Sequence, residues 1–200
     1  TAYTEPPANK HHMKTRVLAI HGAYSSPRIF NYLQQQTHTR TVWQFWNYAG
    51  RNDGLATILE SFQAPLQPHH VVGHSMGGIM ALSLLNQPWV QSVTTISTPL
   101  GGLDVNVFQN MFSRSSFTQD IASHSERIRQ LTNLETNKPV QHIISTQGFN
   151  PWLYEPSDGV VTLRSQRAFA LGATHDVSAN HAEIMLSPET VELLLKFWTH

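Results

Sequence analysis

Short apolar runs alternate with amphipathic segments in the first half of the chain, and this alternation constrains the fold more than any other feature. Runs typical of buried strands occupy residues 17–20, 41–48, 70–73 and 90–97. After each of the first three runs, apolar residues recur at about the 3.6-residue helical period. Strands that alternate with helices form parallel sheets with right-handed crossovers. The sequence therefore predicts an α/β domain whose ligands bind at the carboxyl ends of the strands.

The alternation is interrupted once, by residues 100–139, a segment far longer than the usual connection in α/β units. Two helices are expected in this insertion. One begins near Val105, and the other follows Ser123, whose spacing to Glu126 is typical of a capping box. We therefore expect a small helical cap insertion at about 101–138.

The rest of the chain completes the sheet. A strand is expected at 140–146 and a closing helix at 188–198, with two loops between them, one around Asp158 and one ending near His181. Asp53 is expected to cap the second helix. The predicted fold is a three-layer α/β fold with a mostly parallel sheet of about six strands and helices on both faces.

Composition excludes several classes of protein. The 200 residues include 13 basic and 13 acidic residues and no cysteine, and only 13% of them are charged. A disulfide scaffold is excluded, and so is a nucleic-acid binder with a basic face. The apolar runs are too short to span a membrane, and no signal peptide is visible. We expect one soluble, cytoplasmic domain that is monomeric or weakly associating.

Residues 1–12 differ from the rest of the chain. They contain two prolines, show no apolar periodicity and end in a histidine pair directly before Met13. Such a segment is typical of an expression leader or a flexible arm, and it is left out of the fold prediction. The predicted domain covers residues 13–200.

A GxSxG motif, Gly73-His74-Ser75-Met76-Gly77, joins the third predicted strand to the helix that follows. This is the context of a nucleophile elbow, in which a tight turn raises the serine above the sheet. At the start of a helix, Ser75 would also lie where backbone N–H groups favour negative charge. An ordinary glycine-rich turn or a phosphate-binding loop is the alternative interpretation.

Several segments resemble successive motifs of the α/β-hydrolase superfamily, in particular its lipase and esterase members with a GHSMGG elbow. These segments are LAIHGAYSSP, VVGHSMGG, STPLGG, SDGVV and the late Asn180-His181 pair. The resemblance implies a serine hydrolase whose triad runs in the order Ser, acid, His. It also implies the acid, Asp158, which follows the strand at 140–146, and the base, His181, which precedes the closing helix.

Other residues compete for these two roles. Asp176 is too close to His181 in sequence for the two to come from separate strand ends, and Asp104 and Asp120 fall in the insertion. Ser-Asp-Gly at Asp158 is also a favourable turn without any catalytic role. Of the other histidines, His175 is the reserve candidate for the base.

The chemistry explains why these residue types would be needed. A serine hydroxyl becomes a good nucleophile when an imidazole takes its proton, and a carboxylate holds that imidazole in the correct tautomer. The backbone N–H groups of Ala23 and Met76 are the expected oxyanion donors, with Tyr24 at the mouth of the pocket. His21 is expected only to brace the loop after the first strand.

The insertion is the predicted source of specificity. Its apolar residues Val105, Phe108, Met111 and Phe112 either pack as ordinary core or line an acyl pocket under a cap. The substrate-binding candidates are accordingly Tyr24, Phe108, Met111 and Phe112. The surface at residues 108–112 is also the candidate for transient contact with a lipid interface.

The sequence thus predicts a serine esterase, similar to lipases, that acts on small-molecule or lipid-like esters. The reaction would pass through an acyl-enzyme and would need no metal and no cofactor. Thioester or amide hydrolysis by the same triad remains open. A binding module without catalysis on the same fold is the alternative from a different class.

Overall fold

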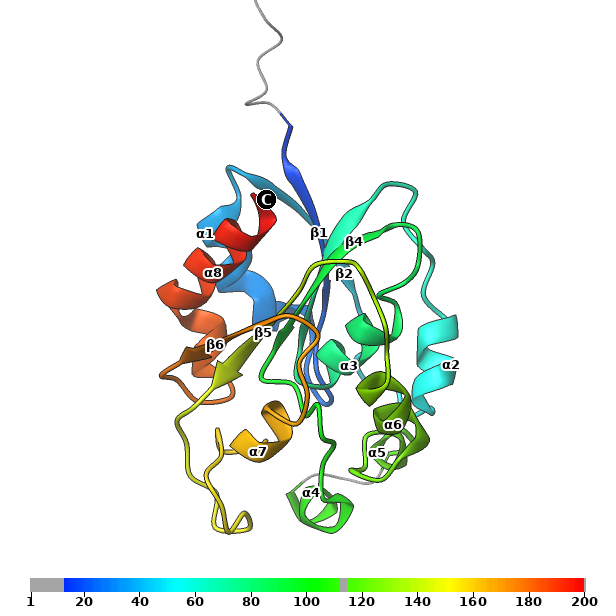
Figure 1. Ribbon diagram of the computed structural model, residues 1–200, viewed down its shortest axis with the longest axis vertical. Coiled ribbons are helices and arrows are strands. Elements are labelled where there is room, and N and C mark those ends of the chain that lie inside the picture. Colours follow the sequence, from blue (N-terminus) through cyan, green and yellow to red (C-terminus); the bar gives the residue numbers. More distant parts are fainter. Residues whose placement is uncertain (1–12, 112–114, 200) are drawn as a thin grey trace, which may run out of the picture.

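The computed structural model describes residues 13–111 and 115–199, and an open sheet of six parallel strands forms its centre (Figure 1). The strands are β1 (Thr15–Ile20), β2 (Thr41–Trp46), β3 (His69–His74), β4 (Val90–Ile96), β5 (Val140–Ser145) and β6 (Ala173–Val177). Their order across the sheet is β2-β1-β3-β4-β5-β6. The predicted α/β fold with about six strands is confirmed, and the described sheet is parallel throughout. Residues 1–12, the expected leader or arm, lie outside the described residues.

Helices cover both faces of this sheet. The α-helices are α1 (Asn31–Thr37), α2 (Leu55–Glu60), α3 (Met76–Ser83), α4 (Val105–Met111), α5 (Phe117–Asp120), α6 (Glu126–Thr132), α7 (Leu163–Gln166) and α8 (Pro188–Trp198), and short 3₁₀ turns are η2 (Pro27–Phe30) and η3 (Glu183–Leu186). In Figure 1, α1 and α8 lie on one side of the sheet, and α2 and α3 lie on the other. Within the two described ranges, no helix is long and apolar enough to cross a bilayer.

Side-chain alternation along β1 explains the two layers. Val17 and Ala19 face one buried cluster, with Leu33 of α1 and Leu194 of α8 among its members. Leu18 and Ile20 point to the opposite face, into a second buried cluster that includes residues of α2, α3 and α6. Successive side chains of a strand point to opposite faces, so a strand that is apolar at every position must be covered on both sides.

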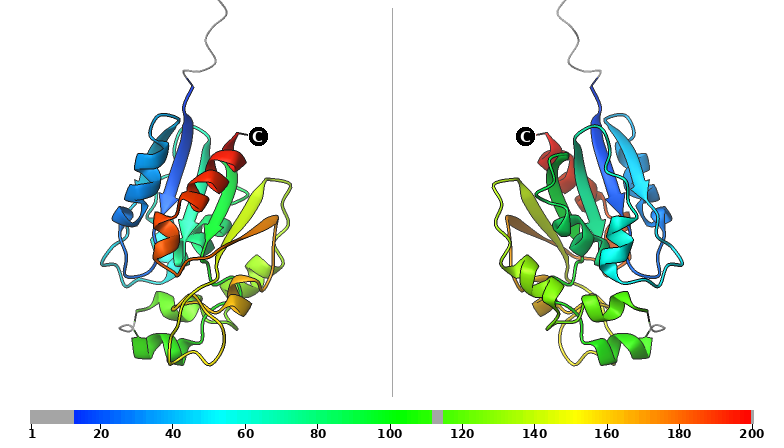
Figure 2. Two further views of the ribbon diagram at one scale, coloured as in Figure 1. Left: turned by 90° about the vertical axis from the view of Figure 1, so that its left-hand side faces the viewer. Right: turned by 90° about the vertical axis from the view of Figure 1, so that its right-hand side faces the viewer.

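The insertion has two parts with different roles. Ile128 and Leu131 of α6 join the core beside α3, as does Phe117 of α5. In contrast, α4 lies beyond the carboxyl ends of the strands, near α7 (Figures 1 and 2). Part of the predicted cap is therefore core, and only α4 and its neighbouring loops lie over the end of the sheet.

Three local predictions were wrong. The sixth strand is β6, within a segment expected to be loop, because this edge strand carries exposed polar residues instead of an apolar run. Asp53 does not cap α2. Instead, the N–H of Leu55 at the start of α2 donates to the carboxylate of Asp120, 65 residues away. Ser125, not Ser123, caps α6 by accepting a hydrogen bond from the N–H of Ile128.

Candidate active site

The strand order places the candidate site at the switch point of the sheet. From β1 the chain moves to β2 on one side, and it returns to β3 on the other side of β1. The loop after β1 and the turn after β3 therefore leave neighbouring strands in different directions, which opens a crevice between them. Gly22 and Ala23 follow β1, and Ser75 follows β3, so the topology brings these residues together.

Ser75 has the backbone conformation of a strained elbow. Its φ of 56° and ψ of −124° lie in a region that L-amino acids rarely adopt. The turn is held on both sides, because the N–H of Ser75 donates to the carbonyl of Ile96 and its own carbonyl accepts from the N–H of Gly78. Strain of this kind costs about 1–3 kcal/mol and concentrates at functional sites.

The glycines of the motif are required by close approach of backbone to backbone. A Cβ on Gly73 would lie 2.2 Å from the carbonyl oxygen of Gly77, and a Cβ on Gly77 would lie 2.0 Å from that of Ile20. Both distances are far below a van der Waals contact. The elbow therefore packs directly against the end of β1, which is where the expected oxyanion loop begins.

We expect Gly77→Ala to destabilise the fold by more than about 3 kcal/mol, because neither backbone segment can move away without disrupting the sheet. Gly54→Ala is the matched control, since the nearest atom to its new Cβ is Asp120 Oδ2 at an ordinary 3.5 Å. Urea unfolding of both variants measures the difference. Equal midpoints for the two variants would contradict the close packing of the elbow.

The loop after β1 touches the serine. A Cβ on Gly22 would lie 3.0 Å from the Cβ of Ser75 and 3.7 Å from its Oγ. Among the described residues, the backbone N–H groups of Ala23 and Met76 donate to no protein acceptor. His21 braces the loop as expected, because it stacks on Tyr48 and accepts from the Tyr48 N–H through Nε2.

Asp158 is a buried carboxylate that accepts four hydrogen bonds. Its Oδ1 accepts from the N–H groups of Val160 and Val161, at 2.9 and 2.7 Å. Its Oδ2 accepts from Ser145 Oγ and from His181 Nδ1, both at 2.6 Å. Burial by itself would raise the pKa of Asp158, but these donors and the nearby imidazole hold it below its usual value.

A polar network lies behind this carboxylate. Ser145, the last residue of β5, also hydrogen-bonds Ser97 Oγ at 2.6 Å. Gln166 of α7 accepts from the N–H of Ser145 and donates to its carbonyl, each at 3.0 Å. All of these side chains are fully buried. The network holds Asp158 through Oδ2, the same oxygen that accepts from His181.

His181 is joined to both neighbouring elements of the site. Its N–H donates to the carbonyl of Asp158, and its own carbonyl accepts from His74 Nε2 at 2.8 Å. The rings of His74 and His181 lie 4.7 Å apart. His74 immediately precedes Ser75, so the structure ties the His181 loop to the elbow. Within the described residues, no direct hydrogen bond joins Ser75 Oγ to His181.

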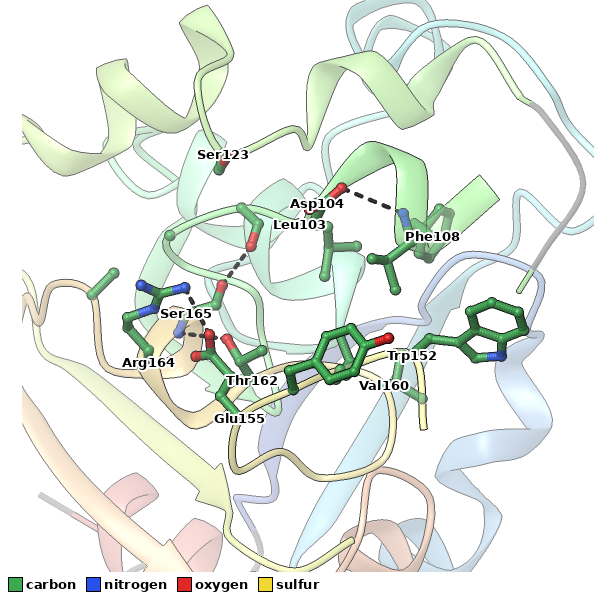
Figure 3. Close-up of a pocket in the computed structure, with 16 residues that line it drawn as sticks. Leu103, Asp104, Phe108, Ser123, Trp152, Glu155, Val160, Thr162, Arg164 and Ser165 are labelled. Atoms are coloured by element: carbon green, nitrogen blue, oxygen red, sulfur yellow. Dashed lines mark hydrogen bonds and ion pairs between the residues drawn. The ribbon is translucent and has the colours of Figure 1, made fainter. Parts of the chain in front are cut away.

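A cavity of about 680 Å³ lies close to Asp158, and Figure 3 shows the residues that line it. Phe108 and Trp152 lie at its apolar end, and the ion-paired Arg164 and Glu155 lie at the other. Val160, which also lines it, donates its N–H to Asp158. Ser75, Asp158 and His181 are not among the lining residues, so the cavity adjoins the candidate triad without containing it.

The predicted substrate-binding residues fall in different places. Phe108 is buried and lines the cavity, whereas Tyr24 is half-exposed, hydrogen-bonds Ser115 Oγ and has its ring 6.2 Å from that of Phe108. Met111 is the last residue of α4, and its side chain, like all of Phe112, lies outside the described residues. The Phe108 ring stacks with that of Tyr24 and is only 6% exposed, and lipid contact at residues 108–112 stays a prediction.

The competing acids and histidine lie away from the elbow. Asp176 forms an exposed ion pair with Arg167, and His175 is its neighbour on β6. Asp104 caps α4, and Asp120 bonds Leu55. In the described ranges, no group of three or more His, Asp or Glu side chains could hold a metal ion.

Sequence reasoning missed Ser145, Gln166 and His74. A serine at a strand end and a glutamine in a four-residue helix carry no pattern that singles them out. His74 carried one signal, its place within the GxSxG motif, but only the fold shows that it reaches a residue 107 positions away.

No family model matches this chain, and no curated protein matches it in sequence. Solved structures do match its fold. The Bacillus licheniformis lipase BlEst2 in mature form has a TM-score of 0.71 at 16% identity, with 97% of this chain and 96% of that chain covered. An enol-lactonase from Burkholderia xenovorans LB400 has a TM-score of 0.64 at 10% identity, with 96% of this chain and 94% of that chain covered.

A thioesterase domain from the curacin biosynthetic pathway is a third similar structure, with a TM-score of 0.61 at 14% identity. It covers 94% of this chain and 91% of its own. The three alignments span nearly the whole of each chain, so the likeness concerns the complete sheet and its helices. The chain has the α/β-hydrolase fold.

Proposed function

We propose that this protein is a serine hydrolase that cleaves carboxylic esters, with Ser75 as nucleophile, His181 as general base and Asp158 as the acid that orients it. One observation carries the proposal. Ser75 is strained at a strand-to-helix elbow, and His181 hydrogen-bonds Asp158. The residue directly before Ser75, His74, hydrogen-bonds the His181 carbonyl, which ties the pair to the elbow. A binding module without catalysis has no need for a buried carboxylate aligned with a histidine in this way.

The reaction would follow from this geometry. His181 Nδ1 donates to Asp158, so Nε2 carries the lone pair that can take the proton of Ser75 Oγ. The serine oxygen then attacks the ester carbonyl, the alcohol leaves with the proton returned by His181, and water releases the acid in a second cycle. Asp158 stays ionised throughout, in keeping with its lowered pKa.

The backbone would stabilise the oxyanion. The N–H groups of Ala23 and Met76 flank Ser75, and that of Met76 belongs to the first turn of α3. Two such donors lower the barrier through fixed dipoles in a site that excludes water, and each is worth about 100- to 1000-fold in rate. We place the larger part of the substrate in the cavity bounded by Phe108 and Val160.

A direct experiment distinguishes the three bonds that the triad could hydrolyse: ester, thioester and amide. The similar structures are named as a lipase, a thioesterase and a lactonase, and one triad serves esters, thioesters and amides alike. We expect hydrolysis of p-nitrophenyl octanoate to exceed that of the matched thioester and anilide in kcat/KM. A fluorophosphonate should label Ser75, as located by peptide mass spectrometry. Labelling elsewhere, or a preference for the thioester, would contradict the proposal.

We also propose that residues 149–154 contact the lipid–water interface when the ester is presented there. Phe149, Trp152 and Tyr154 are 84%, 54% and 98% exposed, and Trp152 and Tyr154 continue into the cavity wall. Aromatic side chains with a polar edge are favoured at membrane interfaces. This loop is a second candidate for the contact, beside the predicted surface at residues 108–112.

Phe149→Ser should weaken binding to phosphatidylcholine vesicles by about tenfold, because a phenyl ring gains about 1.5–3 kcal/mol when buried. Leu66→Ser is the matched control, since Leu66 is 99% exposed but precedes β3 at the other end of the sheet. Vesicle sedimentation measures both variants. Equal affinities for the two variants would show that the loop has no special role.

A further inference from the structure

His74 lies between the two parts of the candidate site. It ends β3, its side chain is buried, and its Nε2 lies 2.8 Å from the carbonyl oxygen of His181. Its ring also contacts the His181 ring, with centroids 4.7 Å apart and planes inclined by 43°. The His74 side chain therefore contacts both the backbone and the imidazole of His181, the candidate base. His74 itself lies one residue before Ser75, the candidate nucleophile.

The hydrogen bond fixes the tautomer of His74. A carbonyl oxygen can only accept, so Nε2 must carry the proton and Nδ1 must carry a lone pair. Nδ1 is fully buried and has no hydrogen-bond partner in the described residues. An unpaired buried nitrogen is unfavourable, and an apolar residue of similar size would avoid it. Apolar packing thus gives no reason for a histidine here, and the contact that an apolar residue could not make is the hydrogen bond to His181.

The same environment keeps His74 uncharged. Burial is the main cause that lowers the pKa of His74 to about 3, and the neighbouring His181 lowers it further. A charged ring at this distance would repel the imidazolium that forms on His181 during proton transfer. A neutral donor can hold His181 without that repulsion.

We propose that His74 is a positioning residue that sets the separation and tilt of the His181 imidazole relative to Ser75. The inference rests on the proposed function, because it assigns His181 the role of base. Asp158 fixes the imidazole at Nδ1 and the backbone N–H of His181, but both contacts come from one loop turn. The contact from His74 fixes the position of His181 relative to the elbow, because His74 directly precedes Ser75.

Three substitutions test this role. His74→Gln keeps an N–H donor at the same number of bonds from the backbone as Nε2, His74→Leu keeps much of the volume without a donor, and His74→Asn has a donor that is too short. We expect kcat for a p-nitrophenyl ester to fall about 10- to 100-fold in the Leu and Asn variants, with little change in KM. His74→Gln should remain within a few-fold of wild type.

Two further measurements separate positioning from folding and from the proposed function. Thermal unfolding should show that both His74→Leu and His74→Gln are folded at the assay temperature, with the Leu variant somewhat less stable because the His181 carbonyl loses its donor. NMR of labelled histidine should show the His181 Nδ1 proton in wild type and in the Gln variant but exchange-broadened in the Leu variant. This signal needs no turnover, so it reports on His74 even if no ester is hydrolysed.

The outcomes are decisive. The proposal is overturned if His74→Leu keeps full kcat and an unchanged His181 signal, or if the Gln variant loses as much as the Leu variant. Failure of the proposed function looks different, because Ser75→Ala would then retain activity whatever residue occupies position 74.

Discussion

Ser75→Ala is expected to lower kcat/KM for p-nitrophenyl esters by about 10⁴- to 10⁶-fold, the largest effect of any single substitution in this chain. The Oγ atom is the proposed nucleophile, and Ser75 is the one hydroxyl residue in the motif from Gly73 to Gly78. The backbone N–H groups of Ala23 and Met76 remain in the variant, so a small residual rate should persist from oxyanion stabilisation. Steady-state kinetics and covalent labelling measure both effects.

Ser83→Ala is the matched control for this loss. Ser83 lies eight residues beyond the nucleophile in the same helix, α3, and its Oγ donates to the carbonyl of Ile79. It should keep wild-type kinetics and fluorophosphonate labelling. If Ser75→Ala instead retained more than about one tenth of the activity, the elbow would not be the catalytic centre and the triad assignment would fail.

Asp158→Asn is expected to lower kcat by about 10⁴-fold, through the tautomer of His181. Four donors converge on the carboxylate, two on each oxygen. A carboxamide has only one accepting oxygen, so either orientation sets its NH₂ group against two donors. If the NH₂ group faces His181, the imidazole must carry its proton on Nε2, where it can no longer act as base.

The same substitution should also destabilise the fold by about 2–3 kcal/mol, because buried donors of Ser145 or of Val160 and Val161 lose their acceptor. Asp176→Asn is the control, since Asp176 is a half-exposed partner of Arg167 and such pairs contribute little. A loss of stability in Asp158→Asn without a loss of kcat would make Asp158 a structural residue only. Differential scanning calorimetry and kinetics on both variants decide between these readings.

The parts of the fold that could be predicted are those with a local signal. Short apolar runs predicted the strands β1 to β5, and the 3.6-residue apolar period predicted the helix α8. Both ends of α8, Pro188 and Trp198, agree with the prediction. Strand β6 could not be predicted, because its residues are polar and it pairs only with β5 at the edge of the sheet. The cap of α2 was missed because it comes from Asp120, far along the chain.

The candidate site divides in the same way. The motif around Ser75 specifies its own strained turn, since Gly73 and Gly77 leave the room that the turn needs. The order of Ser75, Asp158 and His181 was readable through the resemblance. The role of the insertion was left open, and the structure divides it between core at α6 and cavity wall at Phe108.

By itself the sequence determined the layered α/β fold and the glycine-flanked elbow at Ser75, because periodicity and glycines act over a few neighbours. The candidate acid and base came from the family resemblance and remain predictions. Only the tertiary structure decided how these residues meet. The strand order places the loop after β1 against Ser75, and Ser145, Gln166 and His74 reach their partners across separations of 13 to 107 residues. The physical reason is that hydrogen bonds between buried side chains depend on distances set by packing of the whole sheet, which no local pattern encodes.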